Sequence, residues 1–267
     1  METVFVGAAP RIALSVAGAG PLVVFLHGLG GNRRNWDRQV EEFSRHFRAA
    51  AWDARGYGDS EDYEGALQFE DFSRDLVRVL DHFGAERAHL VGLSMGGRIG
   101  RDFALRHPRR VARLVLANTS PGFAALAPEK LKSFVEERRA LDPEAQARRL
   151  IGGGARPGAY EELVESMRKL RKPSYLKTLE ASVAQDLAAP IENIRAPTLV
   201  VTGDEDRLYP PALARDMARR IPGARLAEIE GAGHISNLEQ PERFNAAVLD
   251  FLRQAQTRAD RAPDDAV

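Results

Sequence analysis

A serine stands at the centre of residues 92–96, whose sequence Gly-Leu-Ser-Met-Gly matches the pattern G-x-S-x-G. In a strand-to-helix turn this pattern lifts a serine hydroxyl above the end of a sheet, and its glycines avoid clashes with neighbouring backbone. The apolar run 89–91 precedes the motif, and a helical pattern with Ile99 and Phe103 follows it. We therefore interpret Ser94 as a nucleophile, in preference to an ordinary glycine turn that contains a serine.

A serine hydroxyl at neutral pH needs a base within hydrogen-bonding reach. His234 is the best placed of the six histidines, because Gly-Ala-Gly-His at 231–234 predicts a loop at the carboxyl edge of the sheet. His27 also follows a strand at this edge, and we expect it to shape its loop rather than transfer protons. The other four fall on or beside regular elements and predict packing or surface roles: His46, His82, His89 and His107.

The imidazole in turn needs a carboxylate that fixes its tautomer. Asp204, Glu205 and Asp206 follow the seventh predicted strand, and spacing alone does not decide among them. An acid at this position gives the chain order serine, acid, histidine that is typical of such sites. Asp53 is the rival, but we interpret it as structural, with Asp53 and Arg55 hydrogen-bonded to neighbouring backbone.

Cleavage of an acyl bond also needs two hydrogen-bond donors for the oxyanion. The N–H of Met95 is one candidate, because it lies at a helix N-terminus. The second is expected from Leu29 in the loop 27–31, His-Gly-Leu-Gly-Gly. A phosphate cradle is the alternative for this loop, but it lacks both the Lys-Ser/Thr ending of a P-loop and the G-x-G-x-x-G spacing.

The elements that position these residues follow a strand–helix rhythm. Amphipathic patterns at 36–47 and 72–83 lie between apolar runs, which predicts a buried, mostly parallel sheet with helices on both faces. The first two strands are expected to form an antiparallel hairpin at its edge. Eight runs have strand length: residues 4–6, 12–16, 22–26, 49–52, 89–91, 114–117, 198–201 and 226–229.

The strand rhythm stops between the sixth and seventh strands. We expect an α/β core formed by residues 1–120 and 187–254, with a lid of three or four helices inserted at 121–186. The triple glycine 152–154 could be a hinge or a flexible turn. The polar, alanine-rich tail 255–267 is expected to be disordered.

Composition limits the alternatives. The 267 residues are 44% hydrophobic and 28% charged, which suits a globular core. The 38 basic and 38 acidic residues balance, so neither nucleic acid nor a membrane is an expected partner. The lack of cysteine excludes disulfides and a cysteine nucleophile. We expect no metal and no cofactor. Because the N-terminus shows no signal-peptide pattern, we expect a cytoplasmic location. The oligomeric state is left open.

Together these motifs resemble the α/β-hydrolase superfamily, and the resemblance covers nearly the whole chain. It implies the α/β-hydrolase fold and places the catalytic acid at Asp206, the fourth residue of 203–206. Residues 92–97, 116–119 and 233–242 look most like the 3-oxoadipate enol-lactonases, whereas loop 27–30 differs from the Ser-Leu-Gly of that group. The resemblance therefore implies an esterase or lactonase.

The expected activity is hydrolysis of a small, partly apolar carboxylic ester or lactone through an acyl-enzyme. Two alternatives stay open: a carbon–carbon bond hydrolase acting on a ring-cleavage diketone, and a ligand receptor that retains the triad. The residues expected to contact substrate are mostly apolar and come from the lid and from loops at the sheet edge: Trp36, Phe123, Met167, Tyr175, Leu208 and Ile235.

Overall fold

The computed structural model describes residues 1–123, 128–184 and 190–254. Its strands form one eight-stranded sheet in the order β1-β2-β4-β3-β5-β6-β7-β8, in which only the pairs that involve β2 are antiparallel. Each predicted strand run is confirmed, as is the antiparallel hairpin at the edge. The strands are β1 (Glu2–Val6), β2 (Ile12–Ala17), β3 (Leu22–Leu26), β4 (Arg48–Trp52), β5 (Ala88–Leu93), β6 (Val111–Ala117), β7 (Thr198–Gly203) and β8 (Arg225–Ile229).

The central strands are buried along their whole length, whereas the edge strands are not. Every residue of β3, β5 and β7 is buried, while β1 and β8 share a pattern that ends in a single buried residue. A parallel strand covered by helices on both faces contacts no water, so its sequence is apolar throughout rather than alternating. This explains why the central strands could be recognised from short apolar runs.

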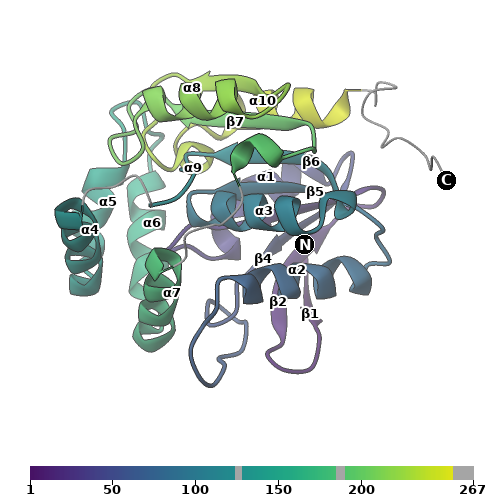
Figure 1. Ribbon diagram of the computed structural model, residues 1–267, viewed down its shortest axis with the longest axis horizontal. Coiled ribbons are helices and arrows are strands. Elements are labelled where there is room, and N and C mark those ends of the chain that lie inside the picture. Colours follow the sequence, from purple (N-terminus) through teal and green to yellow (C-terminus); the bar gives the residue numbers. More distant parts are fainter. Residues whose placement is uncertain (124–127, 185–189, 255–267) are drawn as a thin grey trace.

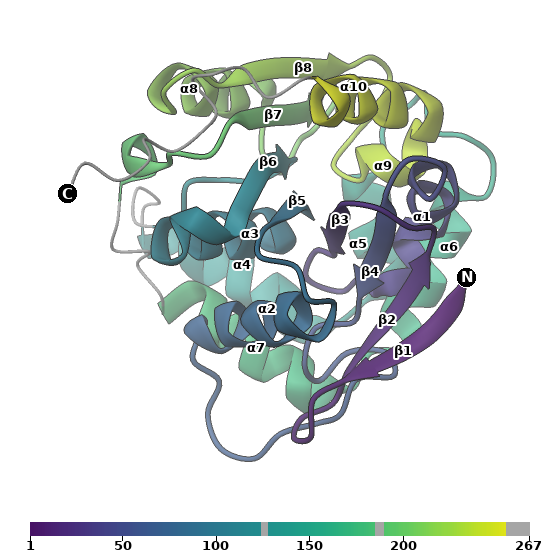
Figure 2. The ribbon, with the colours of Figure 1, turned by 90° about the vertical axis from the view of Figure 1, so that its right-hand side faces the viewer.

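Helices cover both faces of the sheet (Figures 1 and 2). One face carries α1 (Asp37–Phe43) and α10 (Pro241–Arg253), which contact each other, and the other carries α2 (Glu70–His82), α3 (Met95–Arg106) and α8 (Pro211–Arg220). Each layer has its own apolar cluster against the sheet. Short helical turns complete the core: η1 (Arg33–Trp36), η2 (Pro108–Arg110), η3 (Ile191–Asn193) and α9 (Ser236–Glu239).

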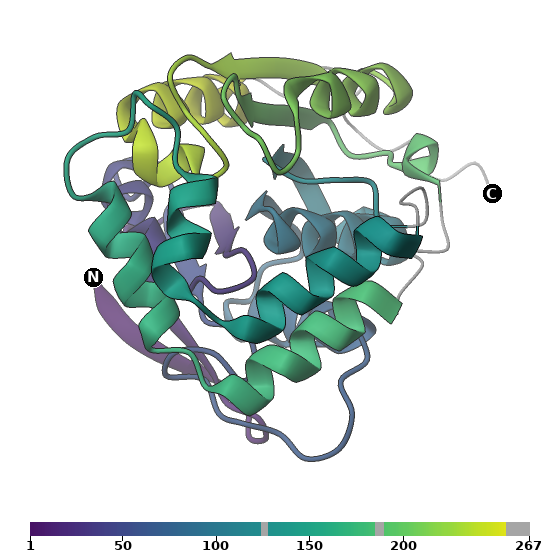
Figure 3. The ribbon, with the colours of Figure 1, turned by 90° about the vertical axis from the view of Figure 1, so that its left-hand side faces the viewer.

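Four α-helices of the described residues lie between β6 and β7, within the segment where the sequence predicts a lid. They are α4 (Pro128–Ala140), α5 (Pro143–Leu150), α6 (Ala159–Arg168) and α7 (Lys172–Ala184), and Figure 3 shows them together in front of the sheet. We call them the inserted helices; their role as a lid stays a prediction. The predicted disordered tail, 255–267, lies outside the described residues. Within the described ranges, no helix is long and apolar enough to cross a membrane.

The register of the sheet gathers the candidate residues at one edge. Leu26 pairs with Gly92, Leu93 pairs with Ala117, and Ala117 pairs with Val201, so parallel strands β3, β5, β6 and β7 end at nearly the same level. The glycine loop 27–31 follows β3, the candidate nucleophile Ser94 follows β5, and the candidate acid Asp206 lies in the loop after β7. The site is therefore assembled where parallel α/β sheets commonly bind ligands.

Candidate active site

The turn between β5 and α3 presents Ser94 in a strained conformation. Its φ of 56° and ψ of −115° are rare for a residue with a side chain. The turn fits so closely against β3 that a Cβ at Gly96 would overlap the carbonyl oxygen of Leu26. Ser94 directly precedes helix α3, where the first N–H groups have no partner within the helix. The serine is thus held at a site suited to a developing negative charge.

His234 lies in the loop after β8 and contacts the serine directly. Its Nε2 is 2.9 Å from Ser94 Oγ, and its Nδ1 is 2.9 Å from Asp206 Oδ2. The ring is 2% exposed and meets the ring of Tyr209 edge-on, with 5.4 Å between centroids. Its backbone N–H donates to the carbonyl oxygen of Leu150, at the end of α5, at 2.7 Å. The imidazole is therefore fixed from both sides.

Asp206, rather than Asp204, is the carboxylate that reaches the imidazole. Its Oδ1 accepts hydrogen bonds from the N–H groups of Leu208 and Tyr209, both at 2.9 Å. Burial opposes ionisation, but the charge of His234 and the hydrogen bonds from His234, Tyr209 and Asn118 hold the pKa of Asp206 below its ordinary value. Asp204 is exposed and accepts the N–H of Gly231 at 2.8 Å, so it braces the loop.

Asn118 connects the loop that carries Asp206 to the loop that carries His234. Sequence reasoning did not single it out. It follows β6 with a φ of 44°, and its Nδ2 donates to Asp206 Oδ2 and to the carbonyl oxygen of Gly233, both at 3.1 Å. Its Oδ1 accepts the hydroxyl of Ser236 at 2.5 Å. A buried polar residue with three such bonds fixes the position of its neighbours.

A second buried carboxylate, Glu239, organises the backbone around His234. Its oxygens accept the N–H groups of Gly233 and Ile235 at 2.8 Å each, and of Gly152 at 2.7 Å. Burial raises the pKa of Glu239, although these backbone donors favour its charged form. Glu239 therefore connects the histidine loop to the inserted helices.

The triple glycine 152–154 is part of this connection. Gly153 N–H donates to Glu205 at 2.6 Å, so adjacent glycines contact one carboxylate from each catalytic loop. A Cβ at Gly152 would come within 2.6 Å of the backbone nitrogen of Gly233. Gly153 and Gly154 form a turn, and Gly152 also permits a close backbone approach. A role as a hinge stays a prediction.

The glycine loop after β3 is held by His27. Its Nε2 accepts the N–H of Ala54 at 3.0 Å, which leaves Nδ1 to donate to the carbonyl oxygen of Gly28 at 2.8 Å. Burial lowers the pKa of His27, in agreement with a neutral ring. Asp53 accepts the N–H groups of Arg33 and Asp59, as expected for a structural residue.

Arg55 departs from the expectation. It binds the side chain of Asp75 at 2.7 and 2.8 Å, and its only backbone contact among these bonds is the carbonyl oxygen of Asp71 at 3.3 Å. Its main partner is therefore a carboxylate on α2 rather than neighbouring backbone.

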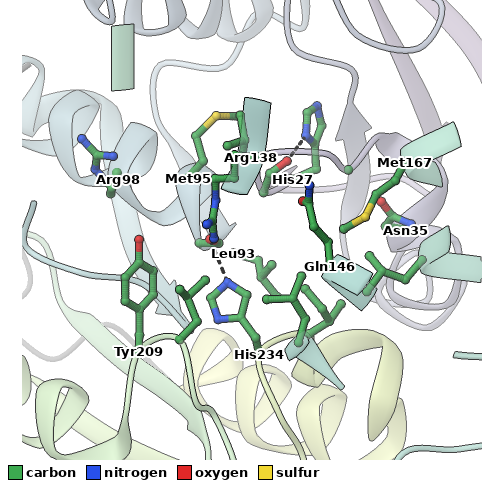
Figure 4. A pocket seen from close by; sticks show the side chains of 18 of the residues that line it. His27, Asn35, Leu93, Met95, Arg98, Arg138, Gln146, Met167, Tyr209 and His234 are labelled. Carbon is green, nitrogen blue, oxygen red and sulfur yellow. Dashed lines mark hydrogen bonds between the residues drawn. The ribbon is translucent and has the colours of Figure 1, made fainter. Parts of the chain in front are cut away.

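A cavity lies between the sheet edge and the inserted helices (Figure 4). Ser94 and His234 open into it, together with both expected oxyanion donors, Leu29 and Met95. Five of the six residues expected to contact substrate also line it: Trp36, Phe123, Met167, Leu208 and Ile235.

Tyr175 is the exception. It is 2% exposed, but it is not among the described residues that line the cavity. Helix α7 packs against α4, and the phenol of Tyr175 lies near that of Tyr57 in the core. Tyr175 is thus placed in the contact between the inserted helices and the core.

Several polar residues of the cavity wall were missed. Arg98 lies on α3, a helix that packs on the sheet. Its position beside Ile99 and near Gly97 could have indicated a buried charge. The described residues contain no group of three or more histidines and acids that could hold a metal ion. The polar residues of the wall that sequence reasoning missed are Asn35, Arg98, Arg138, Gln146, Ser182, Tyr209 and Asn237.

Comparison with known families agrees with this arrangement. A family model described as the alpha/beta hydrolase family matches residues 23–247. The chain therefore belongs to the α/β-hydrolase family, and the fold expected from the motifs is confirmed.

Individual relatives cover nearly the whole chain. It is 29% identical to 3-oxoadipate enol-lactonase 2 of Acinetobacter baylyi, over 92% of this chain and 95% of that protein. It is 32% identical to the 2-hydroxy-6-oxononadienedioate/2-hydroxy-6-oxononatrienedioate hydrolase of Paraburkholderia phymatum, over 91% of each. The crystal structure of the enol-lactonase from Burkholderia xenovorans LB400 matches with a TM-score of 0.83 and 30% identity, over 95% of this chain and all of that one.

Proposed function

We propose that this protein is a serine hydrolase that cleaves a carboxylic ester or lactone through an acyl-enzyme. The observation that carries the proposal is the continuous hydrogen-bonded chain from Ser94 Oγ through His234 to Asp206, with both links at 2.9 Å. Ser94 and His234 both line the cavity between the sheet edge and the inserted helices. These are the relationships that an activated serine requires.

In the first half of the reaction, Ser94 Oγ attacks the carbonyl carbon while His234 Nε2 accepts the hydroxyl proton. Asp206 accepts the hydrogen bond from His234 Nδ1–H and stabilises the imidazolium. The oxyanion is bound by the N–H groups of Leu29 and Met95. The carbon–oxygen bond then breaks, and the imidazolium donates its proton to the leaving alkoxide.

In the second half, a water molecule attacks the acyl-enzyme. His234 Nε2 removes a proton from this water, and the tetrahedral intermediate is again stabilised by the two backbone N–H groups. Collapse of the intermediate returns the proton to Ser94 and releases the carboxylic acid. A lactone follows the same steps, except that the leaving alkoxide stays attached to the acyl chain and both leave as one hydroxy acid.

The relatives support hydrolysis of an acyl bond without identifying one substrate. Two of them are named as enol-lactonases. The relative from Paraburkholderia phymatum is named as a hydrolase of an oxo-dienedioate, which keeps a carbon–carbon bond hydrolase as the second candidate. The ligand receptor is the third, and it predicts binding with little turnover.

The test is labelling with a fluorophosphonate, followed by turnover of short methyl esters and γ- or δ-lactones. We expect one equivalent of label on Ser94, and none on His234→Ala within the same time. Hydrolysis of esters or lactones supports the proposal. Cleavage of a ring-opened diketone with no ester turnover would favour the second candidate, and binding without turnover would favour a receptor. Normal ester turnover in a folded Ser94→Ala variant would overturn the nucleophile assignment.

A further inference from the structure

The cavity wall contains two arginines that the proposed reaction does not use. Arg98 lies on α3, four residues after Ser94, and Arg138 lies on α4. Figure 4 shows Arg98 and Tyr209 on the side of the cavity opposite Met167. Among the described residues that line the cavity, these arginines are the only Asp, Glu, Lys or Arg side chains. The cavity wall is therefore positively charged.

Arg98 is buried without a carboxylate partner. It is 2% exposed, its Nη2 donates to the backbone carbonyl oxygen of Ser182 at 2.6 Å, and its Nε has no partner in the described part of the chain. The guanidinium lies over the rings of Phe69 and Phe123, at 5.2 and 4.4 Å. One carbonyl oxygen and two ring faces leave a buried positive charge incompletely compensated.

The acidic group that interacts with Arg98 does not fill this role. Asp102 interacts electrostatically with Arg98, yet its own oxygens bind Ser73 at 2.7 Å and Arg106 at 2.9 and 3.0 Å. Burial lowers the pKa of Arg98, but a guanidinium stays protonated in proteins. The buried charge of Arg98 therefore lowers the stability of the folded protein.

Arg138 faces the same region. Its guanidinium lies 3.6 Å from the ring centroid of Phe134, and Nη1 makes only a long contact of 3.5 Å with that residue's carbonyl oxygen. The phenol of Tyr209 interacts electrostatically with both arginines, which places them around one part of the cavity. Glu137, the acidic residue next to Arg138 in the sequence, forms a hydrogen bond with Arg149 instead.

We propose that Arg98 and Arg138 form a subsite for a carboxylate, and that the substrate is an ester or lactone bearing a free carboxylate. This inference rests on the proposed function. A planar guanidinium matches a carboxylate with two parallel hydrogen bonds, and Arg98 has an unpartnered Nε for one of them. Arg98 lies four positions after Ser94, a helical rise of about 6 Å, so the carboxylate lies several bonds from the reacting carbonyl.

The test compares monomethyl and dimethyl esters of succinate, glutarate and adipate at pH 8, where the monoesters are anions. We expect wild type to prefer the best monoester over its diester by at least about tenfold in kcat/KM. Arg98→Gln and Arg138→Gln should each reduce that preference by about threefold to tenfold. The matched control is Arg109→Gln, an exposed arginine in η2, which should leave the preference unchanged. No preference in wild type, or equal losses for both esters, would overturn the subsite.

Binding measurements separate this proposal from the proposed function. Ser94→Ala should bind monomethyl adipate at least about tenfold more tightly than dimethyl adipate, with the ionic strength held constant by sodium chloride in both titrations. If this binding holds but wild type cleaves no ester, the proposed function fails and the subsite stands. If esters are cleaved but binding shows no preference, only the subsite fails. Should Arg98→Gln not fold, Arg138→Gln decides, because Arg138 has the weaker contacts.

Discussion

The polar groups on the two sides of the cavity differ in whether they have hydrogen-bond partners. On the catalytic half, Ser94, His234, Asp206 and Asn118 form a closed network in which each side chain has a partner. On the substrate half, Arg98 Nε and Ser182 Oγ are buried and unpartnered in the described residues. Groups that perform chemistry must be fixed before substrate arrives, whereas groups that recognise substrate must be free to bind it.

The contrast predicts that the largest losses come from the catalytic half. Ser94→Ala should lower turnover by roughly four or more orders of magnitude, because the residual rate comes only from binding and the oxyanion donors. His234→Ala should lose about as much, and the double variant little more, since the two act as a unit. The measurement is kcat on the best methyl ester, with thermal unfolding to show that each variant is folded. Losses that multiply in the double variant would mean independent roles.

The next largest effect concerns the acid. Asp206→Asn should lower kcat by roughly three to four orders of magnitude, because the amide cannot stabilise the imidazolium and favours the wrong tautomer. Asp204→Asn is the matched control in the same loop and should cost less than about tenfold, since Asp204 only accepts the Gly231 N–H. A larger loss of kcat for Asp204→Asn than for Asp206→Asn would show that Asp204, and not Asp206, is the catalytic acid.

The lowered pKa of Asp206 adds a pH test of the same network. A carboxyl with a pKa below its ordinary value of 3.8 stays ionised while the pH falls through the range in which a histidine takes up a proton. Below that range the protonated imidazole cannot accept the serine proton. Log kcat/KM should therefore fall toward acid with a slope of one in wild type. A slope of two would mean that a second catalytic group titrates with the histidine.

What the sequence could predict was mainly local. The eight strands and the serine turn follow from short apolar runs and a five-residue motif, whose conformations are set within each segment. The choice of Asp206 needed the family resemblance, because three adjacent acids have the same local context. Only the folded loop shows which carboxylate turns inward.

Features that depend on distant contacts could not be predicted in this way. The triple glycine suggested a hinge or a flexible turn, whereas the approach of the Gly233 backbone from another loop to Gly152 is visible only in the folded protein. Tyr175 was expected to contact substrate because it is apolar and lies in the inserted segment; which face of α7 meets the cavity depends on its packing against α4 and the core. Arg98 was overlooked because a charge on a helix usually faces solvent.

Glu239 tests whether the connection between the two halves supports catalysis. Glu239→Gln replaces one acceptor oxygen by an amide that must face a backbone N–H, so the backbone beside His234 loses a hydrogen bond. We expect kcat to fall about 10- to 100-fold and KM to change less than about threefold. The control is Glu242→Gln, an exposed acid on α10. Equal changes in kcat and KM would place Glu239 in substrate binding instead of positioning.

The smallest expected effect is a change in selectivity on the substrate half. Met167 is buried in α6 and lines the cavity, so Met167→Ala should enlarge the acyl space and move the preferred chain length upward by one or two carbons. Each methylene that fits contributes about 0.8 kcal/mol, so kcat/KM should rise roughly threefold to fourfold per carbon up to the optimum. Leu179→Ala is the matched control, because it removes a similar volume at a buried residue of α7 that does not line the cavity. Both variants should lose stability, but only Met167→Ala should shift the methyl-ester profile. A shift in both would show that the inserted helices adjust as one body. A shift in neither would move selection to four apolar lining residues outside the inserted helices: Leu29, Trp36, Leu208 and Ile235.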